Sequence, residues 1–197
     1  MKLIAKGSEA DIYVDEDRVI KDRIKKSYRL DCIDSELRKT RTKSEFGLMK
    51  KCAEAGVNVP TPIRLDGEYK EIMVKIDGDP LDSVFASKRM QRVGEEVAKM
   101  HAAGVVHGDL TTSNMLVKDE DIFIIDFGLS SFSKKEEDRA TDVFLLKNAL
   151  KSRHYKERTE AFEIFMSAYA KRMGKEFKGI QSHLKDIERR RRYHEDN

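Results

Sequence analysis

The sequence predicts an α+β fold of two lobes: a small, antiparallel β-rich N-terminal lobe over residues 1–77 and a helical C-terminal lobe over residues 78–197. Two observations support this prediction. Residues 2–22 alternate between short strand patterns and turns, whereas apolar residues recur at helical spacing beyond residue 88. A Gly-Asp-Pro connector at residues 78–80 separates the two patterns. Because such residues break regular structure, we expect a hinge there.

The N-terminal lobe is predicted to hold strands and one long helix. Turn-forming acidic residues at 15–17 separate two strand patterns and indicate an antiparallel start. Between residues 35 and 55 the composition changes to helix-forming residues with an apolar face, and the helix is expected to end at Gly56. The expected strands cover residues 3–6, 10–14, 18–21, 63–65 and 71–76.

Helices dominate the predicted C-terminal lobe. Apolar residues from Met90 to Met100 recur at spacings of three and four, which predicts an amphipathic helix over residues 88–103. Two short apolar runs, 114–117 and 122–125, flank a charged turn and predict a small hairpin packed on the helices. The helices expected after this hairpin cover residues 137–152, 157–173 and 180–193.

Composition excludes several classes of protein. A hydrophobic fraction of 39% with 38% charged residues is typical of a folded globular protein. No stretch has the ~20 apolar residues of a membrane span or the apolar core of a signal peptide, so we expect a cytoplasmic protein without membrane contact. Cys32 and Cys52 have no CxxC or CxxH spacing and indicate neither a disulfide framework nor a zinc site.

Two loop segments of the C-terminal lobe contain the residues with catalytic chemistry. Asp109 and Asn114 lie five residues apart, and Asp126 begins an Asp-Phe-Gly motif twelve residues further on. Phosphoryl transfer needs a metal ion that neutralises phosphate charge and a group that orients the attacking oxygen. Mg²⁺ prefers oxygen ligands such as the carboxylate of Asp and the amide oxygen of Asn. We therefore predict Asn114 and Asp126 as metal ligands and Asp109 as the residue that orients or deprotonates the nucleophile.

The segments HGDLTTSN and DFG resemble the catalytic and metal-binding loops of the protein-kinase-like fold. This resemblance implies a minimal bilobal protein-kinase-like fold that binds ATP and Mg²⁺. It also implies that Lys21, on the third expected strand, contacts the α/β-phosphates and pairs with Glu45 in the long helix, with Glu36 as the alternative partner. His107 is expected to have a structural role, and His101 to lie at a helix end.

The nucleotide would also contact the backbone of the N-terminal lobe. The turn between the first two expected strands consists of Gly7, Ser8, Glu9 and Ala10. Its backbone could cover the phosphates, but its single glycine departs from the G-x-G-x-x-G pattern of kinases, and an ordinary hairpin turn is equally consistent with it. By resemblance to the fold, backbone groups near Met73 and Lys75 would bind the adenine.

Departures from the regulated protein kinases narrow the family. Gly108 stands where those kinases usually have an arginine that pairs with an activation-loop phosphate. Only residues 129–141 separate Gly128 from Asp142, without an A-P-E element, so the peptide-binding platform of kinases is too short to form. The segments that match one small family specifically are Lys25–Arg29 with Asp34, Arg41–Glu45 and Glu137–Asp142.

With these segments the chain resembles the small atypical kinases of the KEOPS complex, which are related to the RIO kinases. Val74 departs from the acidic residue usual at the hinge of that family. The resemblance implies a kinase that phosphorylates itself and Ser/Thr sites in proteins. It also implies an ATPase within the complex that makes threonylcarbamoyladenosine on tRNA.

Partners follow from the same resemblance. The C-terminal lobe would contact the threonylcarbamoyl-transferase subunit, and the N-terminal lobe would contact a small regulatory subunit. Lys185 and the run Arg189–Arg192 would contact tRNA, although such a run also suits the solvated end of a helix. The apolar stripe from Phe162 to Met173 is interpreted as core, with part of it open to a partner.

Two other classes of function remain open. Small-molecule phosphotransferases, such as those that act on aminoglycosides, share the HGDxxxxN loop but usually have a larger helical lobe than the about 70 residues that follow Asp126. A scaffold that binds nucleotide only for structure is the second class. The intact Lys21, Asp109, Asn114 and Asp126 argue against it. ATP turnover by the purified chain distinguishes these classes.

Overall fold

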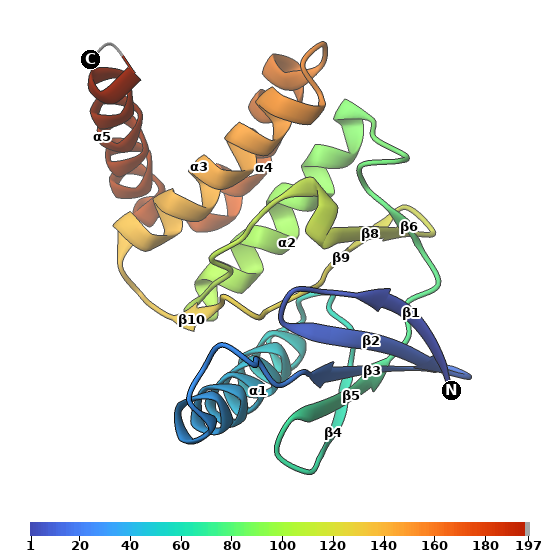
Figure 1. Ribbon diagram of the computed structural model, residues 1–197. Helices are drawn as coiled ribbons and strands as arrows, with labels where there is room; N and C mark the ends of the chain where they lie inside the picture. Colours follow the sequence, from blue (N-terminus) through green and yellow to red (C-terminus); the bar gives the residue numbers. More distant parts are fainter. Residues whose placement is uncertain (196–197) are drawn as a thin grey trace.

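The computed structural model describes residues 1–195, with side chains described as far as residue 191. It confirms the predicted α+β fold of two lobes: in Figure 1 the blue and cyan elements form the lower lobe, and the green to red helices form the upper one. The division between residues 77 and 78 stays a prediction. The elements of the N-terminal lobe are β1 (Lys2–Lys6), β2 (Ala10–Asp15), β3 (Arg18–Arg23), α1 (Asp31–Glu54), β4 (Pro62–Asp66) and β5 (Lys70–Val74).

The C-terminal lobe is mainly helical. Its helices are α2 (Met90–Ala102), α3 (Glu136–Arg153), α4 (Arg158–Met173) and α5 (Phe177–Glu195), with short 3-10 turns η1 (Ser87–Arg89), η2 (Thr112–Asn114) and η3 (Gly174–Glu176). Its strands are β6 (Asp79–Pro80), β7 (Val105–Val106), β8 (Met115–Lys118), β9 (Asp121–Ile124) and β10 (Ser131–Phe132). Among the residues that the structure describes, no helix is both long and apolar enough to cross a membrane.

The N-terminal sheet has the strand order β1-β2-β3-β5-β4, and its neighbouring strands pair antiparallel. A tight turn joins β2 to β3: Asp15 pairs with Arg18, and Glu16 has a positive φ of 53°. This order makes β3 the central strand. Lys21 therefore lies in the middle of the sheet, in register with Ile12 of β2 and Glu71 of β5.

The main core lies in the C-terminal lobe, where α2 packs against α4. The apolar face predicted for α2 is fully buried. Gly94 allows the close approach, because a Cβ at that position would lie 2.6 Å from the carbonyl oxygen of Phe165. Phe165 and Tyr169 of the predicted stripe are fully buried, whereas Phe162 is only partly buried. Most of the stripe is thus core, as interpreted from the sequence.

Several boundaries differ from those predicted. Helix α1 begins at Asp31 rather than at residue 35. The sequence pattern does not show this first turn, because it has no buried apolar face: Cys32 and Ile33 are exposed. The two-residue strands β7 and β10, which pair with each other, were not predicted, since two residues show no periodicity. The pairing of β7 with β10 holds the segment that follows the Asp-Phe-Gly motif beside the end of α2.

Candidate active site

A cavity of about 690 Å³ lies between the two lobes. The predicted site residues that line it are Gly7, Ser8, Glu9, Ala10, Lys21, Glu45, Met73, Lys75, Asp109 and Asp126. Asn114 is not one of its lining residues and instead contacts Asp109. The topology thus brings residues from β2, β3, α1, β5 and the two C-terminal loops around one space.

Lys21 joins the two lobes at this cavity. Its Nζ lies 2.6 Å from Glu45 Oε1 and 2.8 Å from Asp126 Oδ1. Burial acts to lower the pKa of Lys21, but the negative charges around it, chiefly Glu45 and Asp126, outweigh burial and raise the pKa above its ordinary value. The ammonium group is therefore charged at neutral pH. Glu36, the alternative partner, instead accepts a hydrogen bond from Thr40 within α1.

Arg23 extends this network, and sequence reasoning missed it. Its guanidinium is buried and bonds to Glu45 Oε2 and, at 3.2 Å, to Glu9 Oε2. Arg41 of α1 also bonds to Glu9, and this hydrogen bond lowers the pKa of Glu9. The available signal was the strand period, because Arg23 lies two residues after Lys21 and so shares its face of β3. These contacts tie the turn between β1 and β2 to β3 and α1.

That turn is closed by its own backbone. The N–H of Gly7 donates to the carbonyl of Ala10 at 2.9 Å, and a Cβ at Gly7 would lie 2.8 Å from the same oxygen. A glycine is thus required by close approach of the backbone. Because Glu9 is held by Arg23 and Arg41, the turn is fixed at the edge of the cavity.

Residues Met73–Ile76 line the cavity at the connection between the lobes. The N–H of Val74 donates to the carbonyl of Thr61 at 2.9 Å, and the N–H of Lys75 donates to that of Asp17 at 2.8 Å. These two donors are therefore engaged within the N-terminal lobe. An adenine contact at this predicted position would use other backbone groups of the segment.

Asp109 and Asn114, the residues of the predicted catalytic loop, contact each other directly. The side-chain amide of Asn114 donates to the carboxylate and to the carbonyl of Asp109, both at 2.9 Å. The carbonyl of Asn114 accepts the N–H of Ile125 at 3.0 Å, which fixes this loop beside the segment that carries Asp126. The pair is thus held in place before any substrate is present.

Asp126 combines backbone strain with an ionised side chain. Its φ of 63° is in the left-handed region that non-glycine residues rarely adopt. Burial acts to raise the pKa of its carboxyl group, but the charge and hydrogen bond of Lys21 and the N–H of Gly128 outweigh burial and keep the pKa below its ordinary value. Asp126 is therefore a carboxylate over the working pH range.

These donors fit a magnesium ion that arrives with a nucleotide. Asn114 uses its NH₂ group toward Asp109, so its amide oxygen is the group that can bind a cation. Asp126 supplies a carboxylate oxygen. Mg²⁺ is commonly held by one or two protein oxygens together with water and phosphate oxygens, and this pair has that composition.

Asp142 of α3 holds the backbone of the predicted catalytic loop. Its carboxylate accepts the backbone N–H of His107 at 2.5 Å and of Gly108 at 2.8 Å. His101 Nε2 lies 3.1 Å from the same carboxylate, and His101 Nδ1 lies 2.7 Å from the hydroxyl of Tyr169. The expectation that His101 is merely a helix-end residue is wrong, since it is fully buried. His107 is also buried, and its Nε2 lies 3.0 Å from the carbonyl of Ile125.

Gly108 fits this loop for two physical reasons. Its φ is +79°, and a Cβ would lie 2.4 Å from the carbonyl oxygen of Leu129. An arginine at this position, as in regulated kinases, would therefore be strained and would displace the segment after the Asp-Phe-Gly motif. That segment is held without phosphate: Ser130 Oγ donates to the carbonyl of His107 at 3.0 Å, and Ser133 Oγ to Asp138 at 2.5 Å.

Replacing Gly108 by Ala is expected to lower ATP turnover at least about tenfold, because the Cβ pushes the backbone of Leu129 away and misplaces Asp109. Gly67→Ala is the matched control, since Gly67 has a φ of +71° but nothing within 4 Å of a Cβ. The control should lose about 1–2 kcal/mol of unfolding free energy from φ strain alone and keep its turnover. Equal turnover in both variants would contradict the close contact.

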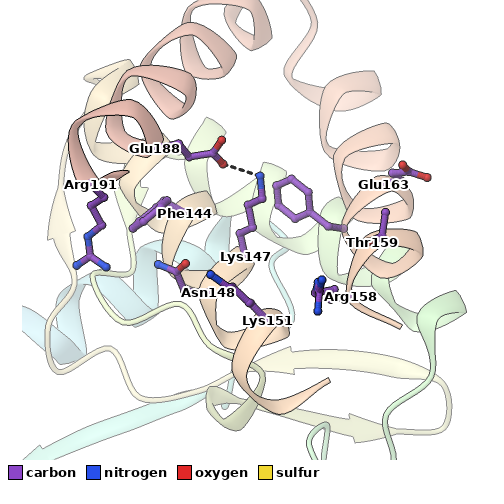
Figure 2. A pocket seen from close by; sticks show the side chains of 10 residues that line it. Phe144, Lys147, Asn148, Lys151, Arg158, Thr159, Glu163, Glu188 and Arg191 are labelled. Carbon is purple, nitrogen blue, oxygen red and sulfur yellow. Dashed lines mark hydrogen bonds and ion pairs between the residues drawn. The ribbon is translucent and has the colours of Figure 1, made fainter. Parts of the chain in front are cut away.

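A second cavity, of about 520 Å³, lies between α3, α4 and α5 (Figure 2). Its lining residues are Phe144, Lys147, Asn148, Lys151, Arg158, Thr159, Phe162, Glu163, Glu188 and Arg191. Lys147 pairs with Glu188 at 2.6 Å, and the Arg191 guanidinium lies 5.1 Å from the centre of the Phe144 ring.

The arginine run predicted to contact tRNA is part of α5. Arg189 pairs with Asp186 at 3.2 Å, and Arg190 pairs with Glu137 at 3.4 Å. The side chain of Arg192 lies outside the described residues. Two of the four arginines are therefore partly neutralised by carboxylates, and Arg191 lies beside the second cavity.

Comparisons with known proteins agree with this geometry. The RIO domain family model matches residues 8–147. The KEOPS complex subunit Bud32 of Pyrococcus abyssi is 38% identical, over 99% of this chain and 97% of that protein. A probable bifunctional tRNA threonylcarbamoyladenosine biosynthesis protein of Methanothermobacter thermautotrophicus is also 38% identical, over 97% of this chain but only 36% of that relative.

Among solved structures, the Rio2 kinase-ADP/Mg²⁺-phosphoaspartate complex of Chaetomium thermophilum has a TM-score of 0.61 at 19% identity, over 96% of this chain and 72% of that one. The amicoumacin kinase hAmiN, in complex with AMP-PNP, Ca²⁺ and Ami, has a TM-score of 0.65 at 12% identity, over 87% of this chain and 72% of that one. At such low identity both likenesses show the fold alone.

Proposed function

Because the chain belongs to the RIO domain family and to the family of the KEOPS complex subunit Bud32, we propose that it is a Mg²⁺- and ATP-dependent atypical Ser/Thr kinase and ATPase that serves threonylcarbamoyladenosine formation on tRNA. The observation that carries the proposal is the arrangement around Lys21. A buried cation of one lobe pairs with Asp126 of the other, beside the Asp109–Asn114 pair.

Each side chain has a role that its surroundings support. The ammonium of Lys21, oriented by Glu45, would bind nucleotide phosphates in place of its contact with Asp126. Asn114 and Asp126 would hold Mg²⁺, which supplies positive charge against the phosphate oxygens. Asp109, fixed by the amide of Asn114, would orient the attacking hydroxyl or water and accept its proton.

Membership of an assembly is supported by the relatives and by one exposed surface. This chain corresponds to 36% of the bifunctional relative. We propose that a threonylcarbamoyl-transferase subunit contacts the C-terminal lobe. Tyr28, Leu30 and Ile33 are large apolar residues exposed just before and within the first turn of α1, and we propose that a small regulatory subunit contacts the N-terminal lobe there. The cytoplasmic location stays a prediction.

Contact between α5 and tRNA can be tested by its salt dependence. In the assembled complex, Arg190→Ser with Arg191→Ser should weaken tRNA binding and reduce the slope of log affinity against log salt by about 1.5, since each phosphate contact contributes roughly 0.7–0.9. Lys43→Ser with Lys50→Ser removes two exposed cations of α1 as a matched control. Equal slopes for the two double variants would place tRNA contact elsewhere.

The test of the proposed function is the product formed from ATP. The purified chain should release ADP in the presence of Mg²⁺ and should transfer phosphate to its own serine or threonine side chains. A small-molecule phosphotransferase would need an added acceptor, and a scaffold would bind ATP without forming ADP. ADP formation that continues unchanged in excess chelator would contradict the metal dependence.

A further inference from the structure

A buried carboxyl group beneath Lys21 has no role in the site described so far. Glu71 on β5 is 1% exposed. Neither of its carboxyl oxygens accepts a hydrogen bond from a donor among the residues that the structure describes. Its side chain is within hydrogen-bond reach of the Glu45 carboxyl group, and that bond forms only when one of the two carboxyl groups carries a proton. Buried acidic side chains are rare without a partner, because a carboxylate loses its hydration and gains nothing in return. This residue therefore needs a physical explanation.

The cations near Glu71 bond to carboxylates other than that of Glu71. It is in register with Lys21 on the neighbouring antiparallel strand, so the two side chains extend from the same face of the sheet. Lys21 bonds to Glu45 and Asp126, and Arg23 bonds to Glu45 and Glu9. On the other neighbouring strand, β4 places the apolar residue Leu65 in register with Glu71.

Charge balance in this cluster is complete without Glu71. The cations are Lys21, Arg23 and Arg41, and the carboxylates bonded to them are Glu9, Glu45 and Asp126. An ionised Glu71 would be one more negative charge, buried and unpaired, next to the carboxylate of Glu45. A proton on Glu71 removes both the desolvation cost and the repulsion.

We propose that Glu71 is a positioning residue of the nucleotide site that remains an uncharged carboxylic acid, so that the positive charge of Lys21 is directed to the phosphates rather than to the sheet beneath it. Burial, followed by the charge of Glu45, raises the pKa of Glu71 to about 9. The effect on ATP rests on the proposed function, whereas the protonation state of Glu71 does not.

The proposal has a pH dependence of defined sign. Below pH 9 Glu71 is neutral, and Lys21 is held only by Glu45 and Asp126. As the pH rises through about 9 the proton leaves to solvent, and the new carboxylate competes with phosphate for Lys21. The KM for MgATP should therefore rise in alkaline solution, with a smaller change in kcat. Lys21 stays charged there, because its own pKa is raised.

The protonation state can be measured directly in the native protein. With glutamate labelled by ¹³C at the carboxyl carbon, one resonance should titrate near pH 9, and Glu71→Gln should remove that resonance. In an unfolded chain the carboxyl group has its ordinary pKa of 4.5. The native state thus binds one more proton between these pH values, and stability falls as pH rises across this window.

Glu71→Gln, which is neutral at every pH, should remove that loss of stability. At pH 8 its Tm should exceed that of the parent by about 3 °C or more. Glu68→Gln is the matched control, because Glu68 lies three residues away, is half exposed and pairs with Lys39. The control should keep the parental pH dependence of Tm and KM. The KM for MgATP should rise about tenfold from pH 8 to 10 in the parent and less than about threefold in Glu71→Gln, because a positioning role acts through the charge beside Lys21.

An ionised, ion-paired Glu71 predicts the opposite results. Glu71→Gln would then lower the Tm at pH 8, and all labelled glutamate carbons would titrate below pH 7 in the native protein. Either result overturns the proposal. The titration is measured on the parent protein, so it does not depend on whether a variant folds. If the resonance near pH 9 is found but the parent forms no ADP from ATP, the protonation state of Glu71 stands and the proposed function fails.

Discussion

Asp126→Asn is expected to lower ATP turnover by at least about 10³-fold while the protein keeps its fold. The substitution removes the only charged oxygen donor of the predicted Mg²⁺ pair, and it also removes the group that holds Lys21 across the cleft. Asp109→Asn should cost about 10²–10⁴-fold, since the nucleophile loses its base while the hydrogen bond to Asn114 can re-form. Steady-state ADP release measures both losses.

Two controls make these losses specific. Asp121→Asn changes an exposed carboxylate of the β8–β9 hairpin in the same lobe and should retain parental turnover. All three variants should unfold within about 4 °C of the parent, because the Asp109 and Asp126 side chains face the cavity rather than the core. A folded Asp126→Asn protein with turnover near that of Asp121→Asn would show that this loop does not serve phosphoryl transfer.

Asp142→Ala is expected to cost about 3–5 kcal/mol of unfolding free energy, a fall in Tm of about 10 °C. The buried carboxylate accepts two backbone N–H groups and contacts His101, and all three would lose their partner. Turnover should fall as well, because His107 and Gly108 set the position of Asp109. Denaturant unfolding and ADP release at a temperature where the variant is folded measure the two effects.

The stability that Asp142 contributes has a pH dependence of defined sign. Burial acts to raise the pKa of Asp142, but His101 and the backbone N–H of His107 outweigh burial, and the pKa lies below its ordinary value of 3.8. The stability that Asp142 contributes is thus present above pH 3.8 and is lost as pH falls through its lower, folded-state pKa. Parent and variant should converge in stability in strong acid. A constant difference down to that pH would mean that packing, not charge, makes the contribution.

The fold could be predicted from the sequence where a pattern extends over many residues. The apolar spacing of α2 and α4 and the turns of the β1–β3 segment are local, and each agrees with the observed packing. The pairing of β7 with β10 could not be predicted, because it depends on bringing two dipeptides together in the folded chain. The start of α1 was also missed, since its first turn faces solvent.

The candidate site shows the same limit. Asp109, Asn114 and Asp126 are recognisable by spacing, because phosphoryl transfer requires those side chains in two adjacent loops. Arg23, Glu71 and the role of Asp142 belong to the tertiary structure. A charged residue on a strand has no sequence signal that distinguishes a buried network from a solvated face. Only the register of β3 with β5 places Glu71 beside Lys21.

The central claim is that the cavity between the lobes converts MgATP to ADP, and the most direct measurement is ADP formation by the purified chain with Mg²⁺ present and after chelation. The parent should form ADP only with Mg²⁺, and with Mg²⁺ present the Asp126→Asn variant should form ADP at least about 10³-fold more slowly. ADP formation at equal rates by the parent and by Asp126→Asn would contradict the claim. A parent that binds MgATP and forms no ADP, alone or with the proposed transferase subunit and tRNA, would contradict it as well.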